Sequence, residues 1–252
     1  MGLKEPGLRG SLRNVSVGIN AIPDTGLSHD YNAEEEPIGE LATWTDQVGA
    51  EDLTAGVAPT VVDDGINNNK SVRFDDTDDL LTAQTNSNWN FLHDGSEFSA
   101  YFVVEANGTD DFNSIASTTD SGGVVAGDLG FTLARDDRDD AGFNDHIRVI
   151  VVNGSDDVIR FEVENEFPQN TPRIYSVRFD GTDQYTINRE KTGLGTPTAS
   201  NHTTDNADNP LSLGRLAMDS DVGRQLYYNI EHDGETHNQV IDALANQFDI
   251  SI

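Results

Sequence analysis

The sequence predicts an all-β protein: a two-sheet antiparallel jelly-roll sandwich with one short C-terminal helix and an extended N-terminal arm. Two observations predict this class. Short runs of β-branched and aromatic residues recur along the chain, each bounded by Gly, Asn or Asp. One segment near the C-terminus has apolar residues at helical spacing. Many strands with one closing helix are typical of two packed sheets.

Residues 1–23 are predicted to form an arm outside the sandwich domain, which would occupy residues 24–252. The arm carries Lys4, Arg9 and Arg13 against Glu5, a charge of +2 (three basic minus one acidic) in a chain of net charge −30. Its glycines and proline disfavour an independent fold. We expect this assembly arm to dock on a neighbouring subunit or another partner, and docking on its own domain is the alternative.

The strands follow the arm. Candidate strands are residues 97–106, 130–135, 146–153, 158–164, 173–179, 184–188 and 210–216. The turn sequences "NGS" at 153–155 and "FDGTD" at 179–183 separate neighbouring strands. The helix is predicted over 234–248, because Val240, Ile241, Leu244, Ala245 and Phe248 share one face there.

One five-residue string, "SVRFD", occurs at 71–75 and again at 176–180, and each copy is followed by x-Thr-Asp. Val and Phe alternate with Ser and Arg, so one face of each strand is apolar. The Asp and Thr side chains are typical of a tight turn. Because the flanking sequences differ, we interpret the copies as two hairpins that share one turn, and not as a domain duplication.

The charge is strongly acidic: 31 Asp and 14 Glu stand against 12 Arg and 3 Lys. Repulsion of this size destabilises a compact state in dilute buffer, and concentrated salt screens it. This acidic composition is typical of halophilic proteins. It is therefore evidence for a salt-rich habitat first, and for a particular binding partner only second. Regular apolar alternation argues against an acidic disordered chain. We expect no nucleic-acid binding, because the sequence has no basic patch to neutralise phosphates.

Cysteine is absent, which excludes disulfides and thiolate metal sites. The first residues carry charges and glycines where a signal peptide has an apolar core, and no run approaches 18 apolar residues. We therefore expect no membrane association. The protein would stay in the cytoplasm or leave without a signal peptide, for example by cell lysis.

From about residue 24 to 252, the order of the elements resembles the concanavalin A-like lectin/glucanase superfamily, in its laminin-G-like branch. The matching pieces are "WTDQVG" (44–49), "DLTAG" (52–56), Pro59, "GINNNKSVRFDDTDDLL" (65–81), "IYSVRFDGTDQYTINREKTG" (174–193), "NPLSLGR" (209–215), a last strand at 226–233 and the helix. Two positions depart from the family pattern: the "GAEDL" loop, and Asp76 where Gly is usual. The resemblance implies a jelly roll. Family members bind sugars or proteins, sometimes with calcium, and a minority hydrolyse glycans, so the fold alone does not assign a function.

A second resemblance concerns the arm. "GLRGSLRN" at 7–14, ahead of such a domain, is similar to virion proteins of tailed viruses of halophilic archaea. Release of particles by lysis would account for the missing signal peptide.

The segment "FEVENEF" (161–167) is a candidate catalytic strand, because it resembles the E-x-D-x-E strand pattern of the glucanase branch. Strand alternation would put Glu162, Glu164 and Glu166 on one face, which suits a retaining pair of carboxylates. The middle residue is Glu instead of Asp, and the chain has only Trp44 and Trp89 to line a glycan cleft. We expect a solvent-facing acidic strand and no glycosidase activity; a hydrolase using Glu162 and Glu166 is an alternative.

Two acidic loops are candidate cation sites. In "RDDRDDAGFND" (135–145), Asp137, Asp139 and Asp140 could supply oxygen ligands to Ca²⁺, and Asp136 belongs to the same candidate ligand-binding loop. The second loop is Asp75 to Asp79. The alternative for each loop is a solvated turn.

The two tryptophans are assigned differently. Trp44 is expected in the core. Trp89 lies among Asn and Ser, so it is a candidate sugar-stacking platform or a loop anchor.

Together these features predict a non-enzymatic structural or adhesion component of a halophilic virus particle, such as a capsid decoration, turret or tail fibre. Its lectin-like domain would bind a host surface glycan or glycoprotein, and its arm would contact other virion proteins. We expect a homo-oligomer on the virion surface. The first alternative is a decoration protein without a ligand.

Overall fold

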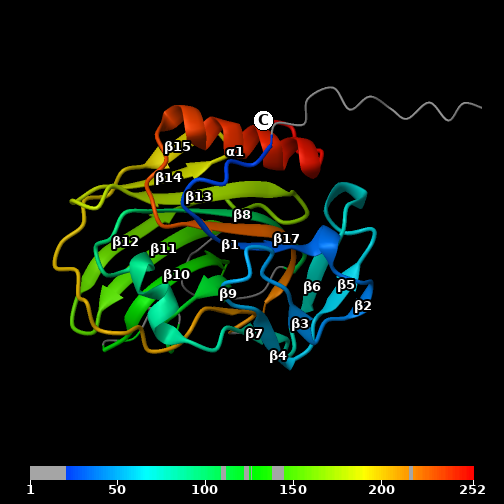
Figure 1. Ribbon diagram of the computed structural model, residues 1–252, viewed down its shortest axis with the longest axis horizontal. Coiled ribbons are helices and arrows are strands. Elements are labelled where there is room, and N and C mark those ends of the chain that lie inside the picture. The colour runs from blue at the N-terminus through cyan, green and yellow to red at the C-terminus, as the bar shows by residue number, and fades with distance from the viewer. Residues whose placement is uncertain (1–20, 109–111, 122–124, 126, 138–144, 216–217) are drawn as a thin grey trace, which may run out of the picture.

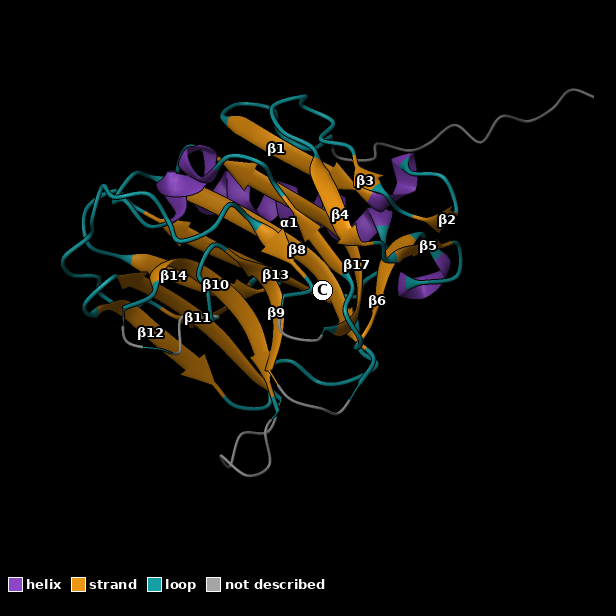
Figure 2. Cartoon of the chain, turned by 90° about the horizontal axis from the view of Figure 1, so that it is seen from below, coloured by secondary structure: helices purple, strands orange, loops and turns teal. Residues whose placement is uncertain are grey.

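A computed structural model describes residues 21–108, 112–121, 125, 127–137, 145–215 and 218–252. Two antiparallel sheets pack face to face, and one helix, α1 (Gly234–Gln247), lies over the outer face of the first sheet (Figures 1 and 2). The fold class predicted from the sequence is confirmed. Residues 1–20, which contain the basic residues of the assembly arm, lie outside the described part of the chain.

The first sheet has the order β15-β14-β13-β8-β17-β6-β5-β2, and β1 also pairs with β17. Its strands are β1 (Leu27–Asn32), β2 (Gly39–Glu40), β5 (Thr60–Val62), β6 (Ser71–Asp75), β8 (Phe98–Ala106), β13 (Arg173–Phe179), β14 (Tyr185–Arg189), β15 (Thr192–Gly195) and β17 (Asp219–Tyr228).

The second sheet has the order β12-β11-β10-β9-β16-β7-β4-β3. Its strands are β3 (Thr43–Trp44), β4 (Leu53–Val57), β7 (Leu80–Thr82), β9 (Phe112–Ser117), β10 (Leu129–Asp136), β11 (His146–Asn153), β12 (Asp157–Val163) and β16 (Ser212–Leu213). Three short 3₁₀ helices connect strands: η1 (Ala33–Glu35), η2 (Ile66–Asn68) and η3 (Asn86–Leu92).

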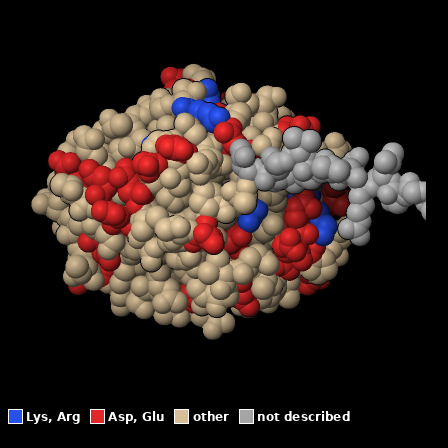
Figure 3. All heavy atoms as spheres, turned by 45° about the horizontal axis from the view of Figure 1, so that its top comes forward, with Lys and Arg blue, Asp and Glu red and all other residues tan. Residues whose placement is uncertain are grey.

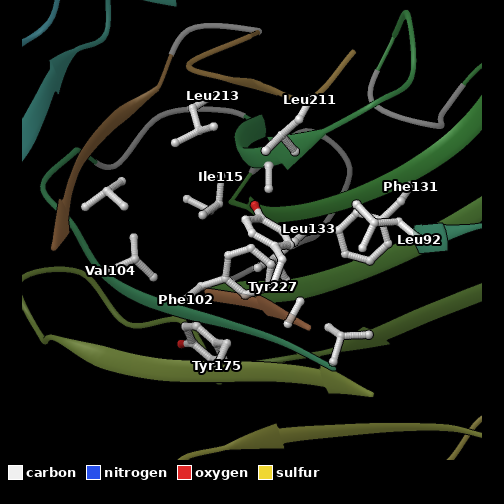
Figure 4. Close-up of a cluster of buried hydrophobic side chains, with 14 of the residues drawn as sticks. Leu92, Phe102, Val104, Ile115, Phe131, Leu133, Tyr175, Leu211, Leu213 and Tyr227 are labelled. Carbon is white, nitrogen blue, oxygen red and sulfur yellow. The ribbon is translucent and has the colours of Figure 1, made fainter. Parts of the chain in front are cut away.

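The main core fills the space between the two sheets, and Figure 4 shows part of it. Phe102 of β8 and Tyr227 of β17 come from the first sheet, and Leu133 of β10 faces them from the second. Trp44 is fully buried in the same cluster, as the sequence predicts. Successive side chains of a β-strand point to opposite faces, so alternate residues of these strands enter the core.

A second apolar cluster lies on the outer face of the first sheet, beneath α1. Val240, Ile241 and Leu244 of the helix, with Phe248 at its C-cap, pack against strand residues that include Val103 and Leu226. The Asp233 carboxylate caps the helix by accepting from the backbone N–H of Thr236. The predicted helix is confirmed. At 14 residues it is too short to span a membrane, and the described part of the chain has no other α-helix.

Most of the predicted strands are confirmed within one or two residues, with two differences. Of the candidate strand 210–216, described as far as residue 215, only Ser212–Leu213 is found as strand, and the last strand ends at Tyr228. The second "SVRFD" copy forms the predicted hairpin, β13 with β14.

The hairpin predicted for the first "SVRFD" copy is wrong, because β6 and β7 belong to different sheets. The neighbours of β6 explain this. β6 already pairs with β5 on one side and β17 on the other, so it has no free edge for β7. The chain therefore crosses the sandwich after Asp79, and β7 pairs with β4 and β16.

The strands define two ends of the sandwich, which we name after the ends of β11. The Asn153 end carries the β11–β12 turn, the β13–β14 turn and the long connection after β15. The Asp136 end carries the ends of β10 and β6. Acidic side chains are far more prominent than basic ones over the face seen in Figure 3, as the net charge of −30 requires.

Candidate functional site

The two acidic loops predicted from the sequence lie at the same end of the sandwich. β10 ends at Asp136, and β6 ends at Asp75, opposite Asp219 of β17. The segment at Gly108 connects them: its backbone N–H donates to the Asp219 carbonyl at 3.5 Å, and its carbonyl accepts from Arg135 at 3.0 Å. The structure thus brings the two loops into one region.

Arginines neutralise the described carboxylates of the first loop. Asp136 is fully buried and forms an ion pair with Arg148. Arg135 is also buried and pairs with Asp137 at 2.8 Å and with Asp145 at 2.5 Å. These ion pairs hold the ends of β10 and β11 together. The sequence suggested that Asp136 belongs to a solvent-exposed ligand-binding loop. This is wrong, because the side chain is buried in an ion pair.

The calcium prediction stays partly untested. Asp139 and Asp140 lie outside the described residues. Within the described ranges, no group of three or more His, Asp or Glu side chains is placed to hold a metal ion.

The three glutamates of "FEVENEF" do not share one face of a strand, and this prediction is wrong. β12 ends at Val163, and Asn165 in the following turn has a left-handed backbone with φ of 61°. The alternation of a strand therefore stops before Glu164. Glu162 pairs with Arg148, and Glu166 pairs with Arg189. The two carboxylates that would act in a hydrolase are thus held by two different arginines.

Trp89 is not a sugar-stacking platform, because its side chain is fully buried. The indole stacks on His29 with ring centroids 4.2 Å apart, and its Nε1 donates to Glu51 at 3.2 Å. Its polar neighbours in η3 occupy the solvent-facing side, while the ring faces the core. Trp89 is the loop anchor that the sequence left as the alternative.

A surface hollow of about 300 Å³ lies at the Asn153 end, at a place the sequence marked only as a turn. The β11–β12 turn forms one wall, and residues just before β10 form the other. Its lining consists of Val125, Gly127, Asp128, Val152, Ser155, Asp156, Asp157 and Arg160. This volume is at the small end of the range for small-molecule sites.

The turn that forms the first wall is fixed by Asn153. Its side-chain oxygen accepts from the backbone N–H groups of Ser155 at 3.0 Å and Asp156 at 2.8 Å. Its side-chain nitrogen donates to the carbonyl of Asn201, at 2.7 Å, in the long connection after β15. Gly154 supplies the left-handed backbone, with φ of 88°, that the turn requires. Ser155 and Asp156 therefore project from a braced turn.

The charged groups of the hollow differ in the hydrogen bonds that they already make within the protein. Arg160 donates twice to Asp157, at 2.8 and 3.1 Å, and this hydrogen bonding raises the pKa of the guanidinium. Asp128 is buried and accepts from the Ser121 hydroxyl at 2.5 Å. Among the described residues, the exposed Asp156 carboxylate has only a long contact, 3.5 Å, with the Ser155 hydroxyl, which also donates to Asn153 Oδ1 at 3.1 Å. Asp156 is therefore the group best placed to exchange water for a ligand, with the exposed Ser155 beside it.

No protein-family model matches the chain, and no curated protein matches it. Solved structures do match. The binding domain of botulinum neurotoxin serotype D is similar over 87% of this chain and 51% of its own, with a TM-score of 0.65 and 9% identity. Trypanosoma rangeli sialidase is similar over 89% of this chain and 34% of its own, with a TM-score of 0.58 and 12% identity.

A third structure, the binding domain of botulinum neurotoxin DC in complex with SialylT, covers 90% of this chain and 52% of its own, with a TM-score of 0.61 and 12% identity. At these identities the likeness shows the fold alone, a two-sheet β-sandwich. The chain spans about half of the toxin domains and a third of the sialidase. An enzyme and binding domains share this sandwich, so the function has to be argued from the site.

Proposed function

We propose that this chain is a non-enzymatic lectin-like domain that binds a hydroxyl-rich host glycan or glycoprotein in the hollow at the Asn153 end. The observation that carries the proposal is the braced turn that projects Ser155 and Asp156 beside Arg160. A carboxylate accepts hydrogen bonds from sugar hydroxyls, a guanidinium donates them, and Val125 and Val152 offer apolar surface to the C–H groups of a sugar ring.

The lining residues that the structure describes include no aromatic ring, so a single site would bind weakly. Display of many copies on one surface converts weak single contacts into strong attachment. We therefore place the domain on the surface of a halophilic virus particle, as a homo-oligomer attached through residues 1–23. The support is the net charge of −30 and the basic, glycine-containing arm that resembles virion proteins.

Glycan binding is tested by probing a glycan array with the purified protein in molar KCl. We expect binding that falls at least tenfold in Asp156→Ala and in Ser155→Ala, because one lost hydrogen bond of about 1.4 kcal/mol corresponds to a factor of ten. The matched control is Asp183→Ala, an exposed carboxylate in the β13–β14 turn at the same end. A protein that binds no glycan would favour the structural decoration alternative.

The same preparation tests the absence of enzymatic activity. Wild-type protein and a Glu162→Gln, Glu166→Gln variant should release equally little sugar from glycans that bind. Release by the wild type that the double variant lacks would restore the hydrolase hypothesis.

The place on a particle is tested separately. Particles purified from lysed cultures of a halophilic host should contain the chain. When particles without this protein are mixed with it, the full chain should attach to them and a chain lacking residues 1–23 should not. A chain found only in the cell, or attachment without the arm, would contradict this part of the proposal.

A further inference from the structure

Buried polar side chains lie between the N-terminal half of α1 and the outer face of the first sheet. Within the described part of the chain, three of their atoms have no hydrogen-bond partner: Ser176 Oγ, Arg178 Nε and His232 Nε2. The ring of His237, a residue of α1, lies among them and bonds the backbone of Glu190. Ser176, Arg178, His232 and His237 are 0%, 8%, 1% and 3% exposed. The C-terminal half of α1 instead covers an apolar cluster. Buried polar atoms are normally paired, so three unpaired atoms in one place require an explanation.

These groups surround Tyr101 of β8. Its hydroxyl lies 2.9 Å from Nδ1 of His232, and its ring centroid lies 5.7 Å from the rings of both His232 and His237. Ser176 of β13 is the register partner of Tyr101. Arg178, two residues further along β13, donates to the carbonyl of His232 at 2.6 Å. The four side chains therefore come together under the start of the helix.

The cluster is rich in donors. Burial raises the pKa of Tyr101, so its hydroxyl keeps its proton and donates to Nδ1 of His232. Nε2 of a neutral His232 then carries the ring hydrogen and is a donor. The Arg178 guanidinium and the Ser176 hydroxyl are donors as well.

The cluster is also positive. Within the described part of the chain, no carboxylate lies within salt-bridge distance of Arg178; its hydrogen-bond partners are neutral, the His232 carbonyl and the Asn188 side chain at 3.4 Å. Burial raises the pKa of the nearby Glu231, and the charge of Arg178 opposes this shift. The buried arginines Arg135 and Arg148 and the partly buried Arg224 each pair directly with a carboxylate. A buried charge without such a direct partner is costly.

We propose that this cluster is a binding site for a small monovalent anion, with chloride as the natural occupant. The anion would accept from Arg178, His232 and Ser176 beside the ring of His237, and it would add counter-charge to the guanidinium. The near-complete burial of these residues leaves no room for an anion as large as phosphate. A surface hollow of about 420 Å³ at the start of α1 reaches His232, and its lining includes Thr25 and Thr236 as well as the acidic residues Glu231 and Asp233.

The direct test is diffraction from crystals grown or soaked in bromide, because bromide replaces chloride and scatters anomalously. We expect an anomalous peak within contact distance of Arg178 Nε and the His237 ring. Ordered water there, or bromide confined to the protein surface, would overturn the proposal. This readout does not depend on glycan binding.

A solution test compares thermal unfolding in potassium chloride and potassium gluconate at equal ionic strength. Gluconate is too large for the site, so the wild-type Tm should be several degrees higher in chloride. Arg178→Met and His237→Gln should lose this difference. Arg224→Met is the matched control: it removes a partly buried arginine that already pairs with Asp30, so it should lower the Tm and keep the difference.

Equal wild-type melting temperatures in the two salts would overturn the proposal, as would a chloride difference that His237→Gln leaves intact. If Arg178→Met does not fold, His237→Gln and the bromide peak decide the question.

Discussion

At the scale of single residues, Asp46 shows what the "WTDQVG" segment does. Its buried carboxylate accepts from Nδ1 of His29 at 2.9 Å and from four backbone N–H groups at 3.0–3.1 Å, those of Asp30, Val48, Ala50 and Glu51. Burial by itself raises the pKa of this carboxyl, but the hydrogen bonds from His29 and the backbone outweigh it and leave the pKa lowered. One carboxylate thus fixes the loop after β3 against β1.

We predict that Asp46→Asn lowers the free energy of unfolding by about 2–3 kcal/mol at pH 7, because it weakens several hydrogen bonds to a charged group. Since the pKa of Asp46 is lower when folded, its contribution is present above pH 3.8 and is lost as the pH falls below that value. Urea unfolding in molar salt should therefore show a wild-type advantage that shrinks toward pH 3. Asp63→Asn, an exposed control, should change little. Equal stabilities of Asp46→Asn and wild type at pH 7 would refute this role.

The two tryptophans show where prediction from sequence stops at this scale. Trp44 is expected in the core and lies there, fully buried at the end of the short strand β3. The burial of Trp89 depends on His29 and on Glu51, which accepts its Nε1 hydrogen from 38 residues away. The polar neighbours of Trp89 give no local signal of these distant partners.

At the scale of elements, the two "SVRFD" copies form the same turn and then diverge. Asp75 and Asp180 each accept from the backbone N–H two residues later, at 3.1 and 2.8 Å. Asp76 and Gly181 both have a left-handed backbone, with φ of 63° and 71°. Local sequence therefore specified the turn. It could not specify the partner of the next strand, because that depends on which sheet edges other strands leave free.

We predict that Asp76→Gly raises the free energy of unfolding by about 0.5–1 kcal/mol, because relief of left-handed strain outweighs the added freedom of the unfolded chain. The gain should be larger in dilute buffer: burial and the neighbouring Asp76 raise the pKa of Asp219, which indicates carboxylate repulsion. Thermal melts measure both effects. The reverse change, Gly181→Asp, should destabilise, because its Cβ would lie 2.6 Å from Cγ of Glu97. A destabilised Asp76→Gly would contradict this account.

The attachment of α1 should depend on pH through His232 and His237. Burial, followed by the Arg178 charge, lowers the pKa of each from 6.5 to about 4. A hydrogen bond to the Glu190 backbone opposes the shift at His237 and Lys191 adds to it, Asp233 opposes the shift at His232, and the Tyr101 ring lies near both histidine rings. Because the unfolded chain binds more protons between pH 6.5 and 4, acidification through this range favours unfolding.

We predict that stability falls by about 1–2 kcal/mol for each of these two histidines between pH 7 and pH 5. The measurement is urea unfolding across this range in potassium gluconate. A His232→Gln, His237→Gln variant should show a clearly smaller loss, and chloride should reduce the wild-type loss if it binds beside the rings. A double variant with the wild-type pH dependence would exclude these histidines as the cause.

At the scale of the whole molecule, the sequence was sufficient to predict the β-sandwich, but it was insufficient to predict which surface residues contact one another. The alternation in "RIYSVRF" predicted β13 to the residue. The engagement of Asp136 could not be predicted in the same way, because it depends on the pairing of β10 with β11, which places Arg148 beside it. The hollow at the Asn153 end likewise requires the β11–β12 turn to meet Val125, Gly127 and Asp128, and beyond the "NGS" turn sequence nothing in these segments indicates that contact.

The acidic surface should make folding dependent on salt. Glu105 is an example: burial, with added repulsion from Asp221, raises the pKa of its half-buried carboxyl, although Arg73 partly offsets this. We predict that the Tm rises steeply from dilute buffer to molar salt, in potassium gluconate as well as chloride, because both salts screen like charges. Glu105→Gln should raise the Tm in dilute buffer and have little effect in molar salt. A wild-type Tm that does not change with the concentration of either salt would show that the charge of −30 is not a source of instability, and would remove the main argument for a halophilic origin.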